Sequence, residues 1–345
     1  MSAARAIAAA AALLPCAACA LNNEQNALHP AGPGAASEAR LYWFMLVIAV
    51  AVWVLVAIVL LWGAARRRGE PRFAHGEVMG EVIRTDERTE RRLVRSVIGA
   101  VAATVLILFV VLVADFRVGQ ALTVPTKRVV PIKVIGHQYW WELWYPDSVP
   151  QNIVVTANEM HVPVGRPVVL TLESRDVIHS FWVPRLAGKK DLLPGYTRSV
   201  WFRADTAGVY RGQCAEFCGY EHAKMAMLVI AEPQAKYDEW IRRQRSAANA
   251  PRDSVAARGK IVFEGSTCVM CHAISGTVAG ATTGPDLSHL ASRQTIAAGT
   301  LANTDANLYA WISDPQRIKP GTLMPATKLD PRDLQALVAY LRQLK

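Results

Sequence analysis

The chain has 345 residues, of which 52% are hydrophobic, and it carries a formal net charge of +10. This length allows two or three domains. The positive charge does not indicate a nucleic-acid partner, because part of the excess lies in one short loop. No basic stripe with interleaved aromatic residues occurs elsewhere in the sequence.

Residues 1–20 are typical of an export signal, with Arg5 ahead of an Ala-rich stretch that ends in LPCAACA. Two kinds of processing fit this segment. Ala20 completes a small-x-small cleavage site, whereas Cys19 would be the lipidated residue of a bacterial lipoprotein. Against lipidation, Cys16 stands where such proteins usually carry leucine. Either kind of processing predicts that the following chain is exported.

Two uncharged runs, 41–62 and 97–114, are 22 and 18 residues long. Each approaches the roughly 20 residues that an α-helix needs to cross a bilayer. No polar face interrupts either run, so buried helices of a soluble protein are a poorer explanation. The segment 64–95 between them carries nine Arg against six acidic residues, which places it in the cytoplasm. We therefore expect a transmembrane hairpin over 41–116 with both ends facing outward.

The next segment, 124–235, has the pattern of a β domain. Short stretches rich in branched and aromatic residues alternate with Gly, Pro and Asp at the joins. No helical period competes with them until about residue 235. An antiparallel β-sandwich or small barrel is the expected fold.

The last third of the chain is expected to be helical. Residues 236–257 suggest a helix and a linker, with Pro251 as the breaker, and 258–345 form a further helical domain. Its final helix would be capped by Asp330, with Pro331 in the first helical position. An apolar stripe follows at helical spacing, formed by Leu334, Leu337, Val338 and Leu341.

The stretch CAEFCGYEHAKM, residues 214–225, gathers Cys214, Cys218, His222 and Met225 between two predicted strands. Thiolate and thioether donors favour copper, and imidazole suits it too. A blue-copper site needs only one cysteine, so the second suggests two coppers bridged by both sulfurs. A second imidazole must then come from elsewhere.

The stretch DVIHSFWVP offers His179 as that imidazole, while His137, His161, His272 and His289 lie in other contexts. A disulfide, a zinc site with two Cys and one His, and a Met that only fills the core are the competing interpretations of the loop.

A second motif, Cys268-x-x-Cys271-His272, is the attachment signature of c-type haem. Met324, on the loop RIKPGTLMP, is the candidate for the second iron ligand, because a thioether suits a haem of high potential. Met270 lies inside the attachment motif and is sterically unsuited to that position. With Cys16 and Cys19 in the signal, no cysteine is left for a structural disulfide.

CAEFCGYEHAKM, DVIHSFWVP and GHQYWWELWY, set behind a two-helix hairpin, together resemble subunit II of the haem-copper cytochrome c oxidases over about 40–235. The resemblance implies an all-β cupredoxin, a Greek-key sandwich, that holds the binuclear CuA centre. The implied copper ligands are His179, Cys214, Glu216 through its backbone carbonyl, Cys218, His222 and Met225. The Glu216 carboxylate would also reach a magnesium ion shared with subunit I. Quinol oxidases, which lack this copper, fit less well because the ligand set is intact.

The resemblance also implies roles outside the copper loop. In the family a Trp directly after the Gln receives electrons; here Tyr139 stands in that position, followed by Trp140 and Trp141, and all three are candidates. An acidic residue near the inner end of the second helix aids proton uptake in the family, and Glu87 and Glu90 are the candidates. Asp176, three residues before His179, is either an orienting partner of that ligand or a turn residue.

The segment 258–345 resembles the small class I cytochromes c, which implies an all-α domain with Met324 on the distal side of the haem. The expected protein is thus the electron-input subunit of a bacterial cytochrome c oxidase. It would receive electrons from cytochrome c or an upstream quinol-oxidising complex and pass them through haem c and CuA to subunit I. There, oxygen is reduced to water with proton pumping. Subunits I and III are the expected partners, at the inner membrane, with both redox domains on the periplasmic side.

Two other classes of protein fit less well. Nitrous oxide reductase also has a CuA domain, but it needs a large His-rich propeller, and this chain has only eight histidines. A membrane-anchored copper carrier would hold one copper with few ligands and would not need a haem domain.

Overall fold

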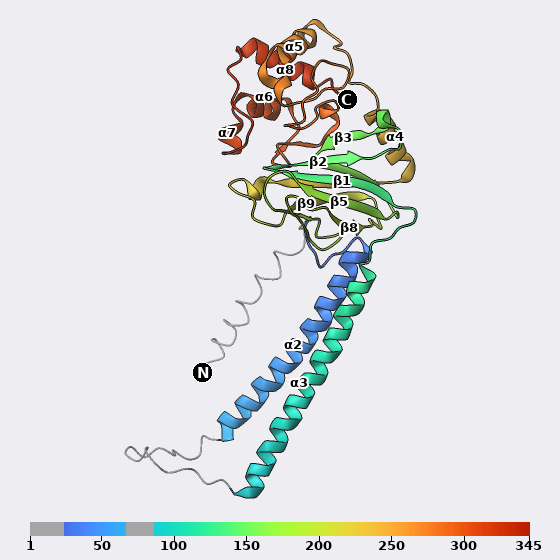
Figure 1. Cartoon of the computed structure of the whole chain (residues 1–345). Helices are drawn as coiled ribbons and strands as arrows, with labels where there is room; N and C mark the ends of the chain where they lie inside the picture. Colours follow the sequence, from blue (N-terminus) through green and yellow to red (C-terminus); the bar gives the residue numbers. More distant parts are fainter. Residues whose placement is uncertain (1–23, 67–85) are drawn as a thin grey trace, which may run out of the picture. The chain divides into compact units, whose positions relative to one another are not determined.

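The computed structural model describes residues 24–66 and 86–345 (Figure 1). The export signal, with Cys16 and Cys19, and the middle of the predicted cytoplasmic loop lie outside the described residues. The chain divides into two compact units, one formed by 37–123 and the other by 124–345 together with the residues before 37.

The smaller unit consists of two long helices, α2 (Pro33–Arg66) and α3 (Glu87–Ala121), which extend beyond the apolar runs at both ends. By length and composition, each is able to cross a membrane, and the most apolar window of each has no part buried inside the chain. The predicted loop 64–95 was too long at its C-terminal end. The Asp86 side chain accepts a hydrogen bond from the Arg88 amide (2.9 Å), caps α3 and starts it nine residues earlier than expected.

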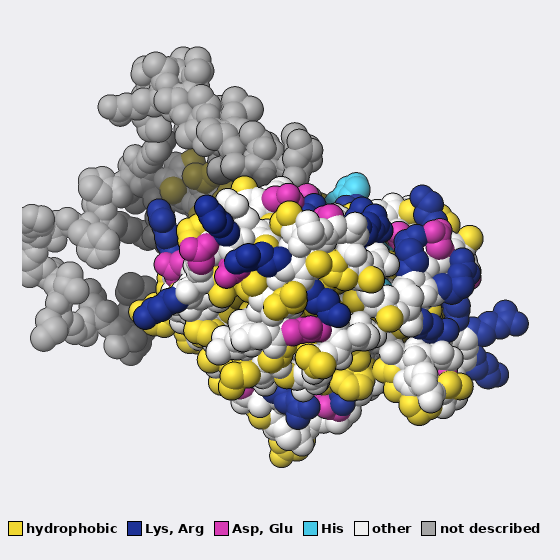
Figure 2. Space-filling model, turned by 90° about the horizontal axis from the view of Figure 1, so that it is seen from above, with side chains coloured by type: hydrophobic (Ala, Val, Ile, Leu, Met, Phe, Trp, Pro, Cys, Tyr) yellow, Lys and Arg dark blue, Asp and Glu magenta, His cyan; other side chains and the backbone are white. Residues whose placement is uncertain are grey.

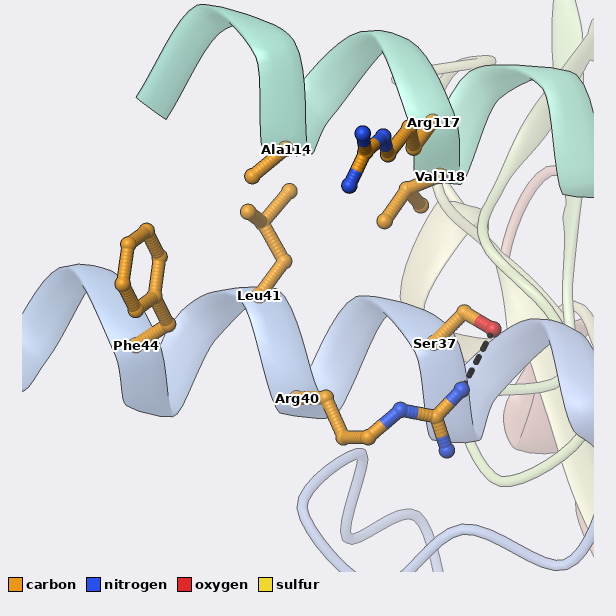
Figure 3. A pocket seen from close by; sticks show the side chains of 7 residues that line it. All are labelled: Ser37, Arg40, Leu41, Phe44, Ala114, Arg117 and Val118. Atoms are coloured by element: carbon orange, nitrogen blue, oxygen red, sulfur yellow. Dashed lines mark hydrogen bonds between the residues drawn. The ribbon is translucent and has the colours of Figure 1, made fainter. Parts of the chain in front are cut away.

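A shallow groove runs between these helices near the outer ends predicted for them (Figure 3). Leu41 and Val118 point into it from facing helices, and the Arg40 guanidinium donates to Ser37 Oγ (3.0 Å). The groove and the helix surfaces are mostly apolar. Such a surface needs lipid or further helices to cover it.

The β domain is a sandwich of two five-stranded sheets, ordered β3-β2-β1-β5-β8 and β4-β10-β9-β6-β7. Its strands are β1 (Val130–His137), β2 (Trp140–Tyr145), β3 (Val154–Ala157), β4 (Glu159–Pro163), β5 (Val168–Ser174), β6 (His179–Trp182), β7 (Lys190–Leu192), β8 (Arg198–Phe202), β9 (Gly208–Cys214) and β10 (Ala226–Glu232), with short 3-10 helices η3 (Pro150–Asn152) and η4 (His222–Lys224) in the connections. The two inner faces supply one apolar core around Trp141, Leu170 and Phe181. The expected sandwich is confirmed.

The sheets are mixed, so the expectation of a purely antiparallel sandwich was wrong. The pairs β1–β5 and β4–β10 are parallel, whereas the other pairs are antiparallel. The reason lies in the connections: the chain leaves the first sheet for β4 and returns at β5 on the free side of β1. A strand that returns across the sandwich in this way runs in the same direction as its new neighbour.

The C-terminal part is helical, as expected. Its elements are α4 (Gln234–Gln244), α5 (Ser254–Gly265), η5 (Thr267–Met270), η6 (Leu290–Ser292), the strand pair β11 (Thr295–Ile296) and β12 (Leu301–Ala302), α6 (Asp305–Ser313), α7 (Pro315–Ile318) and α8 (Pro331–Leu341). Asp330 caps α8 through the Arg332 amide (2.9 Å), and the predicted apolar stripe is buried. The first of these helices, α4, belongs to the core of the sandwich, because Trp240 stacks on His161 with ring centroids 4.3 Å apart.

The described surface of the larger unit carries mixed charges on the face seen in Figure 2. Basic, acidic and apolar side chains lie interspersed there. Interspersed charges of opposite sign largely cancel at a distance, and salt screens what remains of their field. Short-range contacts therefore matter more on this face than a long-range field.

Glycine at position 259 allows α5 and α8 to pack closely. A Cβ there would lie 1.9 Å from the backbone oxygen of Ala336, so Gly259→Ala must push the helices apart. We expect it to destabilise the helical domain by about 1–3 kcal/mol, the usual cost of overpacking. The measurement is the thermal midpoint of the haem absorbance in the purified full chain. We expect it to fall by at least about 4 °C.

Gly265→Ala is the matched control, because no atom lies within 4 Å of a Cβ at the end of the same helix. It should leave the midpoint unchanged or raise it slightly. Equal midpoints for the two variants would contradict the close packing of α5 on α8.

Candidate metal centres

The predicted copper ligands converge at one end of the second sheet. His179 begins β6 and Cys214 ends β9, and these strands are antiparallel neighbours. The connection to β10 then returns with Cys218, His222 and Met225. A hydrogen bond from the Cys214 amide to the Met225 carbonyl (2.9 Å) closes this loop at its base. The sheet therefore fixes both ends of the loop and the histidine from outside it.

The two cysteine sulfurs lie 3.8 Å apart at the centre of the cluster. Each faces one imidazole: Cys214 Sγ lies 3.8 Å from His179 Nδ1, and Cys218 Sγ lies 3.6 Å from His222 Nδ1. Among the described residues, His179, Cys214 and Cys218 form a group whose donor atoms all lie within 4.8 Å of one another.

Two weaker donors complete the arrangement, one beside each sulfur. The Met225 thioether sulfur is 3.8 Å from Cys218 Sγ, and the Glu216 carbonyl oxygen is 3.2 Å from Cys214 Sγ. Two central sulfurs, each with its own imidazole and its own weak donor, fit a pair of soft ions better than one ion. All six predicted donors are thus brought together.

Asp176 orients His179, the histidine that comes from outside the loop. Its carboxylate lies 2.8 Å from His179 Nε2 and also accepts the Gln138 amide (2.7 Å). Burial opposes the imidazolium, but the hydrogen bonds with Asp176 and Cys214 outweigh it and raise the pKa of His179. The carboxylate fixes the ring so that Nδ1 faces the sulfur. Of the two interpretations of Asp176, the structure therefore favours the orienting partner.

The two thiols share their protons unequally. The hydrogen bond between them lowers the pKa of Cys214, against the effect of burial and with help from His179. The same pairing, together with burial, raises the pKa of Cys218. The Cys214 sulfur is therefore ready to bind a cation, whereas the Cys218 sulfur must release a proton when it binds one.

The haem-attachment residues lie at the start of the helical domain. Cys268 is in η5 and Cys271 follows it; both are half-buried, and the four cysteines among the described residues are all free. His272 Nδ1 lies 2.8 Å from the Pro285 carbonyl, so this nitrogen carries the proton and Nε2 is left as the donor. Burial lowers the pKa of His272, which keeps the ring neutral, as an iron ligand must be.

Met324 lies on the irregular loop before α8. Its thioether packs partly buried against the core of the helical domain, and its carbonyl accepts Gln316 Nε2 (2.9 Å). Met270, by contrast, is 70% exposed. The free Cys pair, the oriented His272 and the anchored Met324 fit a haem c.

The comparisons identify the two domains that carry these residues. The family model "Cytochrome C oxidase subunit II, periplasmic domain" matches residues 130–232, and "Cytochrome c" matches 256–345. The chain is 36% identical to cytochrome c oxidase subunit 2 of Alkalihalophilus pseudofirmus, over 93% of this chain and 92% of that protein. The chain belongs to the cytochrome c oxidase subunit II family.

Other members are similar over shorter stretches. Cytochrome c oxidase subunit 2 of Bacillus subtilis is 31% identical, over 70% of this chain and 71% of that protein. The crystal structure of the periplasmic domain of subunit II of cytochrome oxidase from Bradyrhizobium japonicum is 29% identical, with a TM-score of 0.34, over 36% of this chain and 97% of that one.

Membership gives the chain its general role. It is a subunit of a haem-copper oxidase, an oxidoreductase, with an electron-input role. The family implies a copper centre in the sandwich and a haem in the helical domain. Two apolar helices, together with a periplasmic-domain family, indicate a membrane-anchored subunit whose domains face outward.

The candidate electron-input residues occupy different environments. Tyr139 is buried, and its hydroxyl accepts the Tyr220 amide of the copper loop (3.0 Å). Trp140 is half-buried and stacks on His137 at 4.3 Å. Trp141 is fully buried, with its ring edge-on to His179 at 6.1 Å. The structure brings Tyr139 and Trp141, but not Trp140, against the copper loop or its ligands.

The remaining predicted residues have other partners within their own units. The Glu216 carboxylate is exposed and lies 3.3 Å from Lys189 Nζ. Glu87 and Glu90 are exposed in the first turn of α3, where Glu87 pairs with Arg91 (3.1 Å). The Glu216 carboxylate thus pairs with a lysine, while its own backbone carbonyl faces Cys214.

Two residues of the site were missed by the sequence. Gln138 Nε2 donates to the Cys218 carbonyl (2.6 Å), and Lys319 Nζ donates to the Tyr139 carbonyl (2.7 Å). Gln138 lies inside the aromatic motif GHQYWWELWY, so a role for it could have been predicted from the sequence. Nothing in the local pattern around Lys319 indicates its contact.

Replacing the orienting carboxylate should weaken metal binding. Asp176→Ala removes the partner of His179 Nε2, and we expect copper affinity to fall about 10–100-fold, the usual effect of losing such a partner. Competition with a copper chelator measures it. Asp205→Ala is the control, since that carboxylate is exposed and pairs only with Arg203 (2.7 Å) among the ion pairs found. An Asp176→Ala affinity equal to that of the control would rule out the orienting role.

Proposed function

We propose that the chain is the electron-input subunit of a bacterial cytochrome c oxidase that passes electrons from an external donor towards subunit I. The donor is cytochrome c or the upstream quinol-oxidising complex. In subunit I, oxygen is reduced to water with proton pumping. The observation that carries this proposal is the convergence of two cysteines, two histidines and two weak donors on one buried point.

We assign a copper pair to that point, which the thiolates of Cys214 and Cys218 and the imidazoles of His179 and His222 would hold. Met225 and the Glu216 carbonyl are the weak donors. When bound, the copper pair and the haem supply storage and transfer of single electrons. The surrounding chain holds the donors rigidly, because β6, β9 and β10 fix the ends of the loop. A rigid cage changes little when its charge changes, which keeps the reorganisation small.

We assign haem c to the helical domain, bound covalently through Cys268 and Cys271. His272 and Met324 are its iron ligands. The Pro285 carbonyl holds the tautomer of His272, and Gln316 holds the backbone of Met324. Both ligands are thus oriented by the chain before any ion binds.

The helical hairpin would anchor the subunit as a two-pass protein of the inner membrane. Its exposed apolar faces require lipid and the helices of subunits I and III. Glu87 and Glu90, near the inner end of α3, are the proposed proton-uptake residues. Glu216 would hold a magnesium ion shared with subunit I, which requires its carboxylate to leave Lys189.

The proposal requires about two copper ions and one haem per chain. The purified complex should show a near-infrared charge-transfer band and an EPR signal delocalised over two coppers. Cys218→Ser removes one bridging sulfur, so we expect it to lose the delocalised signal while keeping its haem. One copper per wild-type chain with an ordinary localised signal would overturn the assignment.

The haem ligand is tested by Met324→Ala. Loss of the thioether should shift the haem absorbance and lower the haem potential, with the copper content unchanged. Met270→Ala is the matched control, because that side chain is exposed beside the attachment cysteines. If both variants keep the wild-type spectrum, another residue is the distal ligand.

A further inference from the structure

The cytochrome domain, residues 256–345, and the copper-binding sandwich meet at a network of hydrogen bonds within one compact unit. Lys319 provides a buried charged member of this network. Only 2% of this residue is exposed, and its ammonium donates to the Tyr139 carbonyl of the sandwich (2.7 Å) and the Ala297 carbonyl of its own domain (3.3 Å). One cation thus joins a carbonyl from each domain.

Burying a lysine is expensive unless its donors are satisfied. Burial lowers the pKa of Lys319 to about 7, with the nearby Glu221 acting in the opposite direction. Neither haem attachment nor the copper ligand set requires a lysine there. The arrangement is explained if the buried ammonium serves the contact between the domains.

The residues around Lys319 connect the two candidate cofactor sites. On one side, Gln316 in α7 holds the carbonyl of Met324 (2.9 Å). On the other, the Ile318 carbonyl accepts Lys224 Nζ from the copper loop (2.7 Å), next to the ligand Met225. The five residues from Pro315 to Lys319 therefore contact both the loop that carries Met324 and the segment 214–225 that carries the proposed copper ligands.

Tyr139, the partner of Lys319, is itself tied to the copper loop. Its hydroxyl accepts the Tyr220 amide (3.0 Å), and the neighbouring Gln138 donates to the carbonyl of the bridging ligand Cys218 (2.6 Å). The residue at the position that receives electrons in the family is thus hydrogen-bonded, through its backbone carbonyl, to the chain's own cytochrome domain.

A second contact lies at the edge of the sandwich. The Glu159 carboxylate, only 3% exposed, accepts the amides of Gln294 (2.8 Å) and Thr295 (2.8 Å), and the Thr295 hydroxyl (3.1 Å). Between the two contacts, the Ala226 amide donates to the Ala298 carbonyl (3.0 Å). The domains are therefore held by contacts at several positions along both of them, not by Lys319 alone.

We propose that Lys319 is a positioning residue that docks the cytochrome domain on the copper loop and so sets the rate of electron transfer between the two centres. This role rests on the proposed function for its electron-transfer part, whereas the docking itself needs only the protein contacts. Tunnelling rates fall steeply with distance, so a loosened dock slows transfer. Charge-assisted hydrogen bonds from a buried lysine are strong enough to hold such a dock.

The test is Lys319→Met in the full chain within its purified complex. Methionine keeps the length and burial of the side chain but cannot donate to Tyr139. Hydrogen exchange of peptides that contain the amides of Ala226, Gln294 and Thr295 reports the dock directly. We expect exchange there to accelerate at least about tenfold, the effect of losing one charge-assisted hydrogen bond. Lys319→Arg, which restores a donor, should recover part of the protection.

The second readout is the rate at which an electron injected at the haem by a photoexcited ruthenium complex appears at the copper. We expect Lys319→Met to slow it at least about tenfold, with unchanged haem and copper spectra. Lys328→Met is the matched control, because that lysine is exposed on the same loop. Glu159→Gln loosens the dock from its other side and should act in the same direction if Lys319→Met does not fold.

Unchanged exchange in both Lys319→Met and Glu159→Gln would overturn the docking role. Faster exchange with an unchanged transfer rate would overturn the positioning role. A wild-type chain without paired copper would instead contradict the proposed function, and the exchange experiment would still decide whether Lys319 docks the domain.

Discussion

The structure of the copper site depends on the pairing of β9 with β10. This pairing ends at Cys214 and Met225, whose backbones are joined by one hydrogen bond of 2.9 Å. The connection between these residues contains the short 3-10 helix η4 and carries the second sulfur, Cys218, and the second imidazole, His222. Because the base is fixed, the loop has few ways to close, and the two sulfurs are held 3.8 Å apart. The rigidity comes from the sheet, while the chemistry comes from the loop.

The β6 strand adds the one ligand that the loop lacks. His179 enters the cluster because β6 is the neighbour of β9, with Phe181 opposite Cys214. Asp176 then fixes the ring from the turn before the strand. Gly136 on β1 leaves the necessary room, since a Cβ there would approach the His179 ring within 2.8 Å. The ligand is thus held by its own sheet, by a turn and by the facing sheet.

Local sequence was sufficient for features that are themselves local. Cys214, Cys218 and His222 lie within one short segment, and Cys268, Cys271 and His272 within five residues, so their spacing made both groups candidate sites. Asp330 and the apolar stripe after it predicted α8 for the same reason. His179 was found through its own motif, although it comes from a different strand.

Features that depend on distant partners were not accessible in this way. The parallel pair β1–β5 follows from the path of the chain between the sheets, and no residue pattern marks that path. The helices α2 and α3 extend past their apolar runs because the polar residues that flank these runs can also be helical. No local pattern marks Lys319 and Glu159 as buried, because their hydrogen-bond partners come from distant segments of the chain.

The position of Glu159 also bears on how the open edge of the second sheet is covered. It lies on β4, which is an edge strand of the second sheet, and an edge exposes unpaired backbone groups to any strand of another chain. The cytochrome segment at 294–295 lies against this strand through the carboxylate. The fused domain therefore lies against an edge that would otherwise be open to a strand of another chain.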